Sequence, residues 1–197
     1  KASPGGASCT TSGTSCVVQG LANGQAYTFT VKASNEAGDS PVSDPADPVT
    51  PRTVPQSPSG VGGVPGNGKV TVSWVVPDSD GGAPIAGYTV VASPGGASCV
   101  TAGTSCVVEG LTNGQAYTFT VVAANVAGDS PASESSNPVT PRTTPGAPTQ
   151  VFGVPADKQV EVSWTGPVSN GGAPITGYTV KASPGGASCT TSGTSCV

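Results

Sequence analysis

Lys69-Val70-Thr71-Val72-Ser73-Trp74 alternates polar and apolar residues along its whole length. A half-buried β-strand shows this alternation, because successive side chains point to opposite faces of a sheet. Val70, Val72 and Trp74 would then share the buried face. The segment therefore predicts a strand whose inner face ends in a tryptophan.

The same alternation indicates further strands elsewhere, and no segment carries a helical period of useful length. Gly (29) and Pro (20) together make up about a quarter of the 197 residues, close to the level typical of disordered chains. The patterned apolar residues favour a folded chain instead. We predict an all-β protein with short strands between turns, arranged as a sandwich. The other alternating sets are Tyr88, Val90 and Ala92; Tyr117, Phe119, Val121 and Ala123; and Tyr27, Phe29, Val31 and Ala33.

A nine-residue phrase recurs at a constant interval of 90 residues, beginning at Lys1, at Val91 in a variant form, and at Lys181. A repeat of about this length is a domain, since it can enclose a small core alone. The chain is therefore predicted to be part of a tandem domain array. Other residues that recur at this interval are Trp74 and Trp164, Tyr27 and Tyr117, and Tyr88 and Tyr178.

The copies are not equally similar. Residues 1–17 are identical to residues 181–197, whereas the middle copy carries Val91, Val100 and Ala102 in place of Lys, Thr and Ser. Alternate copies thus match better than adjacent ones, which suggests a super-repeat of 180 residues.

Proline-rich stretches at 48–58 and 138–148 are where linkers are expected. The sequence has no Met, and with these boundaries it would begin and end inside a domain. We therefore expect an internal segment of a longer repetitive polypeptide. The predicted division is a C-terminal part-domain at 1–53, a complete domain at 54–142 and an N-terminal part-domain at 143–197.

The six cysteines form three pairs spaced by seven residues, with a Ser/Thr/Gly turn inside each pair. A hairpin centred on that turn would place the two cysteines opposite each other, within disulfide reach. Zinc is the rival interpretation, but zinc sites want four ligands at closer spacing and the chain has no His. Disulfides imply an oxidising, extracellular setting. The predicted pairs are Cys9 and Cys16, Cys99 and Cys106, and Cys189 and Cys196.

Charged residues make up 9% of the chain, and the formal net charge is −4. No basic cluster is present to neutralise phosphates, so nucleic-acid binding is disfavoured. No apolar run approaches the length of a membrane span, and no signal peptide is present in this segment.

Together these residues resemble fibronectin type III domains. Trp74 and Trp164 match the family's tryptophan on the second strand, and Tyr88 and Tyr178 match its third-strand tyrosine after a Pro-containing loop. A Leu followed six residues later by Tyr, as in Leu111 and Tyr117, resembles the tyrosine corner of sandwich folds. The Gly-Gly-Ala-Pro-Ile loops and Ala-Gly-Asp-Ser-Pro segments resemble versions carried by secreted bacterial proteins. The resemblance implies tandem seven-stranded immunoglobulin-like sandwiches. It places these residues in their cores: Trp74, Trp164, Tyr88, Tyr178, Leu111, Tyr117 and Phe119.

Candidate sites are few. Asp78-Ser79-Asp80-Gly81-Gly82 has the look of a calcium loop, but its repeat at 168–172 lacks both carboxylates, which favours a plain turn. Ala37-Gly38-Asp39-Ser40 lies where some family members carry Arg-Gly-Asp, but the Arg is absent. No His is available as a base and no carboxylate pair marks a cleft, so we predict no catalytic, metal or cofactor site and no enzyme activity.

The linkers place Thr beside Pro at 50–55 and 140–145. Such segments suit O-linked glycans on a surface stalk, and a simple extended linker explains them equally well. The predicted partners are neighbouring repeats of the same polypeptide, with lateral self-association as a further expectation.

Two functions remain open at this stage. The first is a structural segment of an extracellular or cell-surface filament, stalk or adhesin shaft, which the fixed period and near-identical copies favour. The second is a spacer or accessory binding module of a secreted polysaccharide-degrading enzyme, a common setting for bacterial members of the family.

Overall fold

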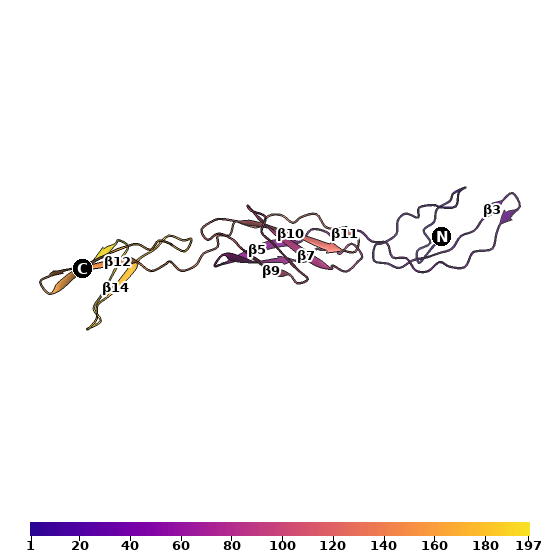
Figure 1. Cartoon of the computed structure of the whole chain (residues 1–197). Coiled ribbons are helices and arrows are strands. Elements are labelled where there is room, and N and C mark those ends of the chain that lie inside the picture. The colour runs from indigo at the N-terminus through magenta and orange to yellow at the C-terminus, as the bar shows by residue number, and fades with distance from the viewer.

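The computed structural model describes residues 1–197, and its regular elements are all β-strands. We call residues 1–53, 54–142 and 143–197 the first, middle and last units. Figure 1 shows these units in a row along an elongated chain, with the strands densest in the middle unit. The predicted all-β fold is confirmed. The structure contains no helix that is long and apolar enough to cross a membrane.

The middle unit consists of two antiparallel sheets. The first sheet has the order β5-β6-β9, and the second has the order β11-β10-β7-β8. The seven strands are β5 (Ser59–Gly66), β6 (Lys69–Val75), β7 (Gly87–Ser93), β8 (Ser98–Thr101), β9 (Ser105–Glu109), β10 (Thr118–Asn125) and β11 (Gly128–Asp129).

Alternation along the strands sends one face of each sheet into a shared core. In β6, the side chains of Val70, Val72 and Trp74 are buried, whereas the residues between them are exposed. In β10, the buried residues are likewise every second one. Twelve buried residues from both sheets form a single cluster. Within it, the Trp74 ring packs on the Tyr88 ring, with centroids 5.3 Å apart and planes inclined by 57°.

The aromatic residues singled out from the sequence lie at different depths. Trp74, Tyr88, Leu111, Tyr117 and Phe119 all belong to the core cluster of the middle unit. In the last unit, Trp164 is buried and packs on Tyr178 at 5.2 Å.

Tyr178 is only half-buried, contrary to its expected place in a core. By the 90-residue repeat, residues 143–197 correspond to residues 53–107. They therefore include no counterpart of β10, the strand that contributes Phe119 and Val121 to the core of the middle unit.

A serine-rich segment covers the free edge of β10 after β11 ends. Ser130, Ser133 and Ser136 each donate their backbone N–H to a carbonyl of β10, at 2.8 to 2.9 Å. Each serine hydroxyl oxygen also accepts the N–H of that same β10 residue, at 2.9 to 3.0 Å. Serine side chains thus replace the carbonyls that a regular strand would supply. The partners on β10 are Ala123, Val121 and Phe119 respectively.

The first and last units contain shorter pieces of the same arrangement. In the last unit, one sheet has the order β12-β13-β16 and a second pairs β14 with β15, as in the middle unit. Its strands are β12 (Thr149–Ala156), β13 (Gln159–Thr165), β14 (Tyr178–Lys181), β15 (Ser188–Thr191) and β16 (Ser195–Cys196). The first unit has β1 (Ala2–Ser3) paired with β2 (Thr28–Phe29), and β3 (Ser34–Asn35) paired with β4 (Gly38–Asp39).

Candidate functional site: disulfides, joints and turns

Each unit contains one disulfide bond. The bonds join Cys9 to Cys16, Cys99 to Cys106 and Cys189 to Cys196, and no cysteine is free. The paired Cα atoms lie 6.2 to 6.3 Å apart, within the usual range for a disulfide. The structure therefore pairs the cysteines as the sequence predicts.

In the middle and last units the strands that carry the disulfide do not form the expected hairpin, and in the first unit the two cysteines lie outside the strands. β8 pairs with β7 in the four-stranded sheet, whereas β9 pairs with β6 in the three-stranded sheet. The bond between Cys99 and Cys106 therefore connects the two sheets at the edge where the chain crosses between them. The last unit repeats this crossing with β15 and β16.

A tyrosine closes a tight corner before each long core strand. In the middle unit, the Thr112 N–H donates to the Tyr117 hydroxyl oxygen at 3.0 Å. In the first unit, the Ala22 N–H donates to the Tyr27 hydroxyl oxygen at 2.9 Å. This contact back to nearby backbone is the tyrosine corner of sandwich folds.

The joint between the first and middle units is a direct backbone contact. A Cβ atom added to Gly82 would overlap the Gly24 backbone nitrogen, and one added to Gly81 would overlap the Thr53 carbonyl oxygen. Backbone hydrogen bonds hold the linker to both units. The Gly24 N–H donates to the Pro51 carbonyl at 2.9 Å. The Thr53 N–H donates to the Gly81 carbonyl and the Gln56 N–H donates to the Ser79 carbonyl, also at 2.9 Å.

The joint between the middle and last units has the same construction. A Cβ atom added to Gly172 would overlap the Gly114 nitrogen, and one added to Gly171 would overlap the Thr143 carbonyl oxygen. The corresponding hydrogen bonds run from the N–H of Gly114 to Pro141 O (2.9 Å), of Thr143 to Gly171 O (2.8 Å) and of Gly146 to Ser169 O (2.9 Å).

Asn125 secures the first of these joints from the side of the middle unit. Its buried side-chain amide donates to the carbonyl oxygens of Thr53 in the linker, at 2.9 Å, and of Asp80, at 2.6 Å. Its Oδ1 accepts the Ala127 N–H at 2.7 Å, so the end of β10 is tied to the linker. Sequence analysis did not single out this residue, because nothing near it in the chain reveals its linker partner.

The loop with the look of a calcium site uses its carboxylate within a turn. Asp80 Oδ1 accepts the Gly82 N–H at 2.8 Å, and Asn170 Oδ1 accepts the Gly172 N–H at 2.9 Å in the repeat. A turn of this kind needs only a side-chain oxygen, which explains why Asn replaces Asp. The structure brings no three His, Cys, Asp or Glu side chains together in a way that could hold a metal ion.

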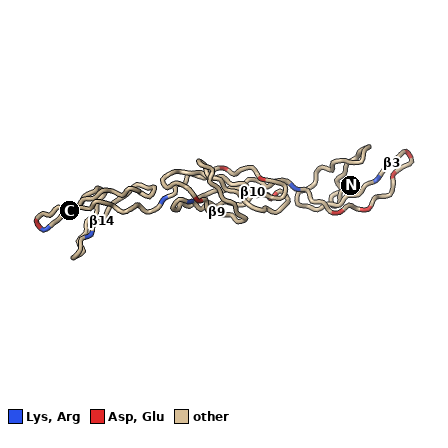
Figure 2. The backbone as a smooth tube through the Cα atoms, in the orientation of Figure 1, with Lys and Arg blue, Asp and Glu red and all other residues tan.

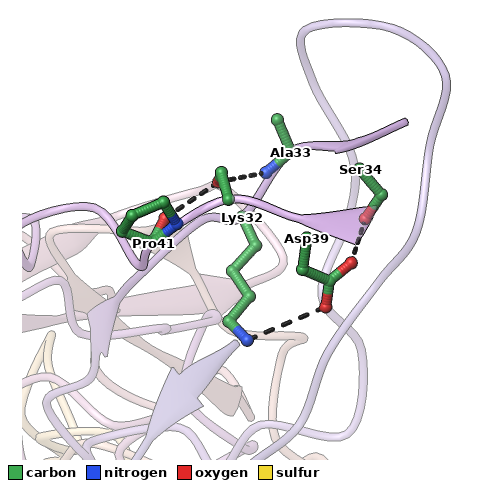
Figure 3. A network of polar contacts seen from close by, with 6 residues as sticks. Lys32, Ala33, Ser34, Asp39 and Pro41 are labelled. Atoms are coloured by element: carbon green, nitrogen blue, oxygen red, sulfur yellow. Dashed lines mark hydrogen bonds and ion pairs between the residues drawn. The ribbon is translucent and has the colours of Figure 1, made fainter. Parts of the chain in front are cut away.

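The Ala-Gly-Asp-Ser turn of the first unit is held by its own side chains (Figure 3). The Ser34 hydroxyl donates to Asp39 Oδ1 at 2.6 Å, and Lys32 Nζ lies 3.8 Å from Asp39 Oδ2. All of these groups are exposed, so the ion pair is worth less than about 1 kcal/mol. The aspartate thus has a local partner within the turn.

Two of the three substitutions that set the middle copy of the 17-residue stretch apart, Val91 and Val100, lie on the outer face of the four-stranded sheet, and Ala102 lies in the turn after β8. Thr89 on β7 is paired with Val100 on β8 and with Val122 on β10. Val91 lies two residues after Thr89 on β7, and therefore on the same face of the sheet. Val91 and Val100 are 39% and 74% exposed, so these side chains face solvent. These two substitutions therefore alter the outer face of this sheet and not its buried face. In the first unit, Lys1, Thr10 and Lys32 occupy the positions of Val91, Val100 and Val122. In the last unit, Lys181 and Thr190 occupy the positions of Val91 and Val100.

Charged residues occur at scattered positions along the backbone (Figure 2). A three-stranded sheet and a four-stranded sheet that share one core and a tyrosine corner define an immunoglobulin-like β-sandwich. Residues 55–139 match the sequence profile of the family described as "Fibronectin type III domain". The middle unit is therefore a fibronectin type III domain.

Similar proteins come from animals and bacteria alike. Myomesin-2 of Homo sapiens is 33% identical over 187 residues, which cover 83% of this chain and 12% of that protein. Chitinase A1 of Niallia circulans is 34% identical over 139 residues, covering 66% and 19% respectively. Exoglucanase B of Cellulomonas fimi is 32% identical over 184 residues, covering 85% and 17%. The chain thus spans less than a fifth of the length of each of these proteins.

Proposed function

We propose that this chain is a structural repeat segment of an extracellular or cell-surface filament, stalk or adhesin shaft. The observation that carries the proposal is that two joints, 90 residues apart, have the same backbone bonds at equivalent positions. A chain that only tethers domains does not need the same hydrogen bonds at every joint. A chain that must keep its shape over many repeats needs them, because each joint then holds its two units in the same way.

The disulfides support the extracellular part of the proposal. Each unit carries one, and such bonds persist mainly in oxidising compartments outside the cytosol. In the middle and last units the disulfide also connects the two sheets of the sandwich, which suits a segment exposed to proteases and mechanical load. In this proposal the segment itself catalyses no reaction.

The second candidate function is a spacer or accessory binding module of a secreted polysaccharide-degrading enzyme. The similarity to Chitinase A1 and Exoglucanase B favours it, as does the resemblance of the loops to bacterial versions of the domain. In that case the rigid joints would hold a catalytic domain at a fixed distance from a binding module.

Immunogold electron microscopy of the native source, with an antibody against this chain, separates the two functions. A filament predicts labelled extracellular fibres with beads about 35 Å apart, the length of eight-residue strands plus their loops. Reduced and denatured material would then run far above the 18.9 kDa of this chain. Labelling confined to a soluble protein that degrades chitin or cellulose would support the enzyme spacer instead. A discrete reduced band near 18.9 kDa would refute a continuous repetitive chain.

Intact-mass measurement of the same material detects any sugar on the exposed Thr53 and Thr143.

A further inference from the structure

The two joints of the chain are equivalent although the residues around them differ. We propose that the repeat has two complementary ends, an Asn-Gly turn and a Gly-Gly loop, that dock successive units in one fixed orientation. In this chain the middle unit contributes both ends, the first unit contributes the turn at Asn23-Gly24, and the last unit contributes the loop at Gly171-Gly172. The partner of each end is another unit of the same repeat. The stiffness of the chain then comes from this docking and not from the linker prolines. The proposal stands whichever of the two functions above is correct.

The docking geometry is reproduced closely in the two joints. A Cβ atom added to Gly24 would lie 3.2 Å from the Gly82 Cα, and one added to Gly114 would lie 3.2 Å from the Gly172 Cα. The linker threonine donates to the first glycine of the loop at 2.9 Å in one joint and 2.8 Å in the other. Ala22 and Asp80 near the first joint are replaced by Thr112 and Asn170 near the second. The constant parts are therefore the turn, the loop and the threonine.

Glycine is needed in the loop for two independent reasons. Gly81 and Gly82 have positive φ angles of 76° and 84°, and Gly171 and Gly172 have 72° and 88°, which L-residues with a Cβ rarely adopt. In addition, a Cβ at any of these four positions would overlap backbone atoms of the linker or of the preceding unit. A loosely tethered domain would satisfy the first requirement alone. The overlaps at Gly82 and Gly172 arise only when the two units touch, whereas those at Gly81 and Gly171 are with the linker.

Asn125 shows how the linker is held to the middle unit beside the joint. Its counterpart in the first unit, Asn35, accepts the Ala37 N–H at 2.8 Å, just as Asn125 accepts the Ala127 N–H. Asn125 additionally donates to the linker and is buried, whereas Asn35 makes no linker bond and is exposed. Residues 1–197 include no counterparts of Thr53 and Asp80 that Asn35 could contact. Asn125 is therefore buried by the linker and by the loop of its own unit.

A Gly82→Ala variant of the 197-residue chain tests the docking. Gly95→Ala is the matched control, because Gly95 also has a positive φ, 94°, but open space where a Cβ would point. We measure amide hydrogen exchange by nuclear magnetic resonance. In Gly82→Ala, the Thr53 and Gln56 amides are expected to exchange about tenfold faster or more, because their bonds to the loop open locally. The Thr143 and Gly146 amides at the other joint are expected to be unchanged, and Gly95→Ala is expected to alter neither pair.

A second variant covers the case in which Gly82→Ala unfolds the middle unit, seen as lost protection throughout β6 and β10. Asn125→Ala removes the side-chain bonds to the linker and loop and the bond from the Ala127 N–H. Asn35→Ala is its control, because it loses only the equivalent bond from the Ala37 N–H. Asn125→Ala is expected to speed exchange at Thr53, and Asn35→Ala is not.

Residual dipolar couplings of the unchanged chain provide the direct readout of orientation. Docking predicts that amides of β6 and of β13 fit a single alignment tensor. Pro145→Ala, which alters an exposed linker proline, is expected to preserve that fit. The proposal is overturned if the two strands need separate tensors, if Gly82→Ala behaves like Gly95→Ala, or if Pro145→Ala separates the tensors.

Discussion

Replacing Ser133 by alanine is expected to destabilise the middle unit far more than a surface serine normally would. The Ser133 hydroxyl oxygen accepts the Val121 N–H at 2.9 Å, and both residues are buried. Alanine keeps the backbone bond from residue 133 to the Val121 carbonyl but leaves the Val121 N–H without an acceptor. Water does not reach this N–H, because the serine segment covers the edge of β10.

The magnitude follows from the cost of an unsatisfied buried donor. Leaving a buried N–H without a partner costs about 1–3 kcal/mol. We therefore expect the free energy of unfolding to fall by about 2 kcal/mol. Because the denaturant dependence for a small domain is about 1 kcal/mol per molar urea, the midpoint is expected to fall by about 2 M.

Urea titration of the whole chain, followed through the amide signals of β6 and β10, reports on the middle unit alone. The matched control is Ser135→Ala, because Ser135 is exposed and its hydroxyl makes no hydrogen bond within the chain. That control is expected to change stability by less than about 0.5 kcal/mol. Equal midpoints for Ser133→Ala and Ser135→Ala would refute the proposed role of the hydroxyl.

Three further predictions concern the core and the disulfides. Trp74→Ala is expected to lower the free energy of unfolding of the middle unit by about 3–5 kcal/mol, because a large buried side chain is lost; a midpoint close to that of the unchanged chain in the same titration would contradict this. Thiol labelling of unreduced, denatured protein is expected to find almost no free cysteine, and complete labelling without reductant would exclude the bonds. Cleaving the Cys99–Cys106 bond is expected to lower the free energy of unfolding by about 2.5 kcal/mol, because the closed loop is short. Burial raises the pKa of the Tyr88 phenol above its ordinary value of 10.0. As the pH rises, the unfolded chain therefore loses this proton before the folded chain does. The contribution of the protonated Tyr88 to the free energy of unfolding is complete below about pH 10 and is lost as the pH rises from there toward the folded-state pKa. Tyr88→Phe is expected to flatten this alkaline decline, and an unchanged decline would argue against Tyr88 as its source.

Features carried by residues close together in the chain could be predicted from the sequence. The alternation in Lys69–Trp74 specifies which side of β6 is buried, because the two faces of a strand are set by residue parity alone. The cysteine pairs could be assigned because seven residues separate each pair and no His offers a competing metal site. The repeat shows the cysteine pair three times and the alternating strand twice, at 69–74 and 159–164.

Features that depend on distant segments required the tertiary structure. The crossing of β8 and β9 into different sheets was not foreseen, because a turn flanked by short strands is equally compatible with a hairpin and with a connection between sheets. The serines that cover β10 are spaced by three, so a search for a period of two passes over them.

The joints show the same division most clearly. From the sequence, the segment that ends in Gly81-Gly82 was only a turn, Asn23-Gly24 was not singled out, and the proline-rich stretch was a simple extended linker. The tertiary structure decided that these two turns, almost 60 residues apart in the chain, lie in backbone contact. A local pattern determines which face of an element is buried, whereas its partner is chosen only when all elements pack together.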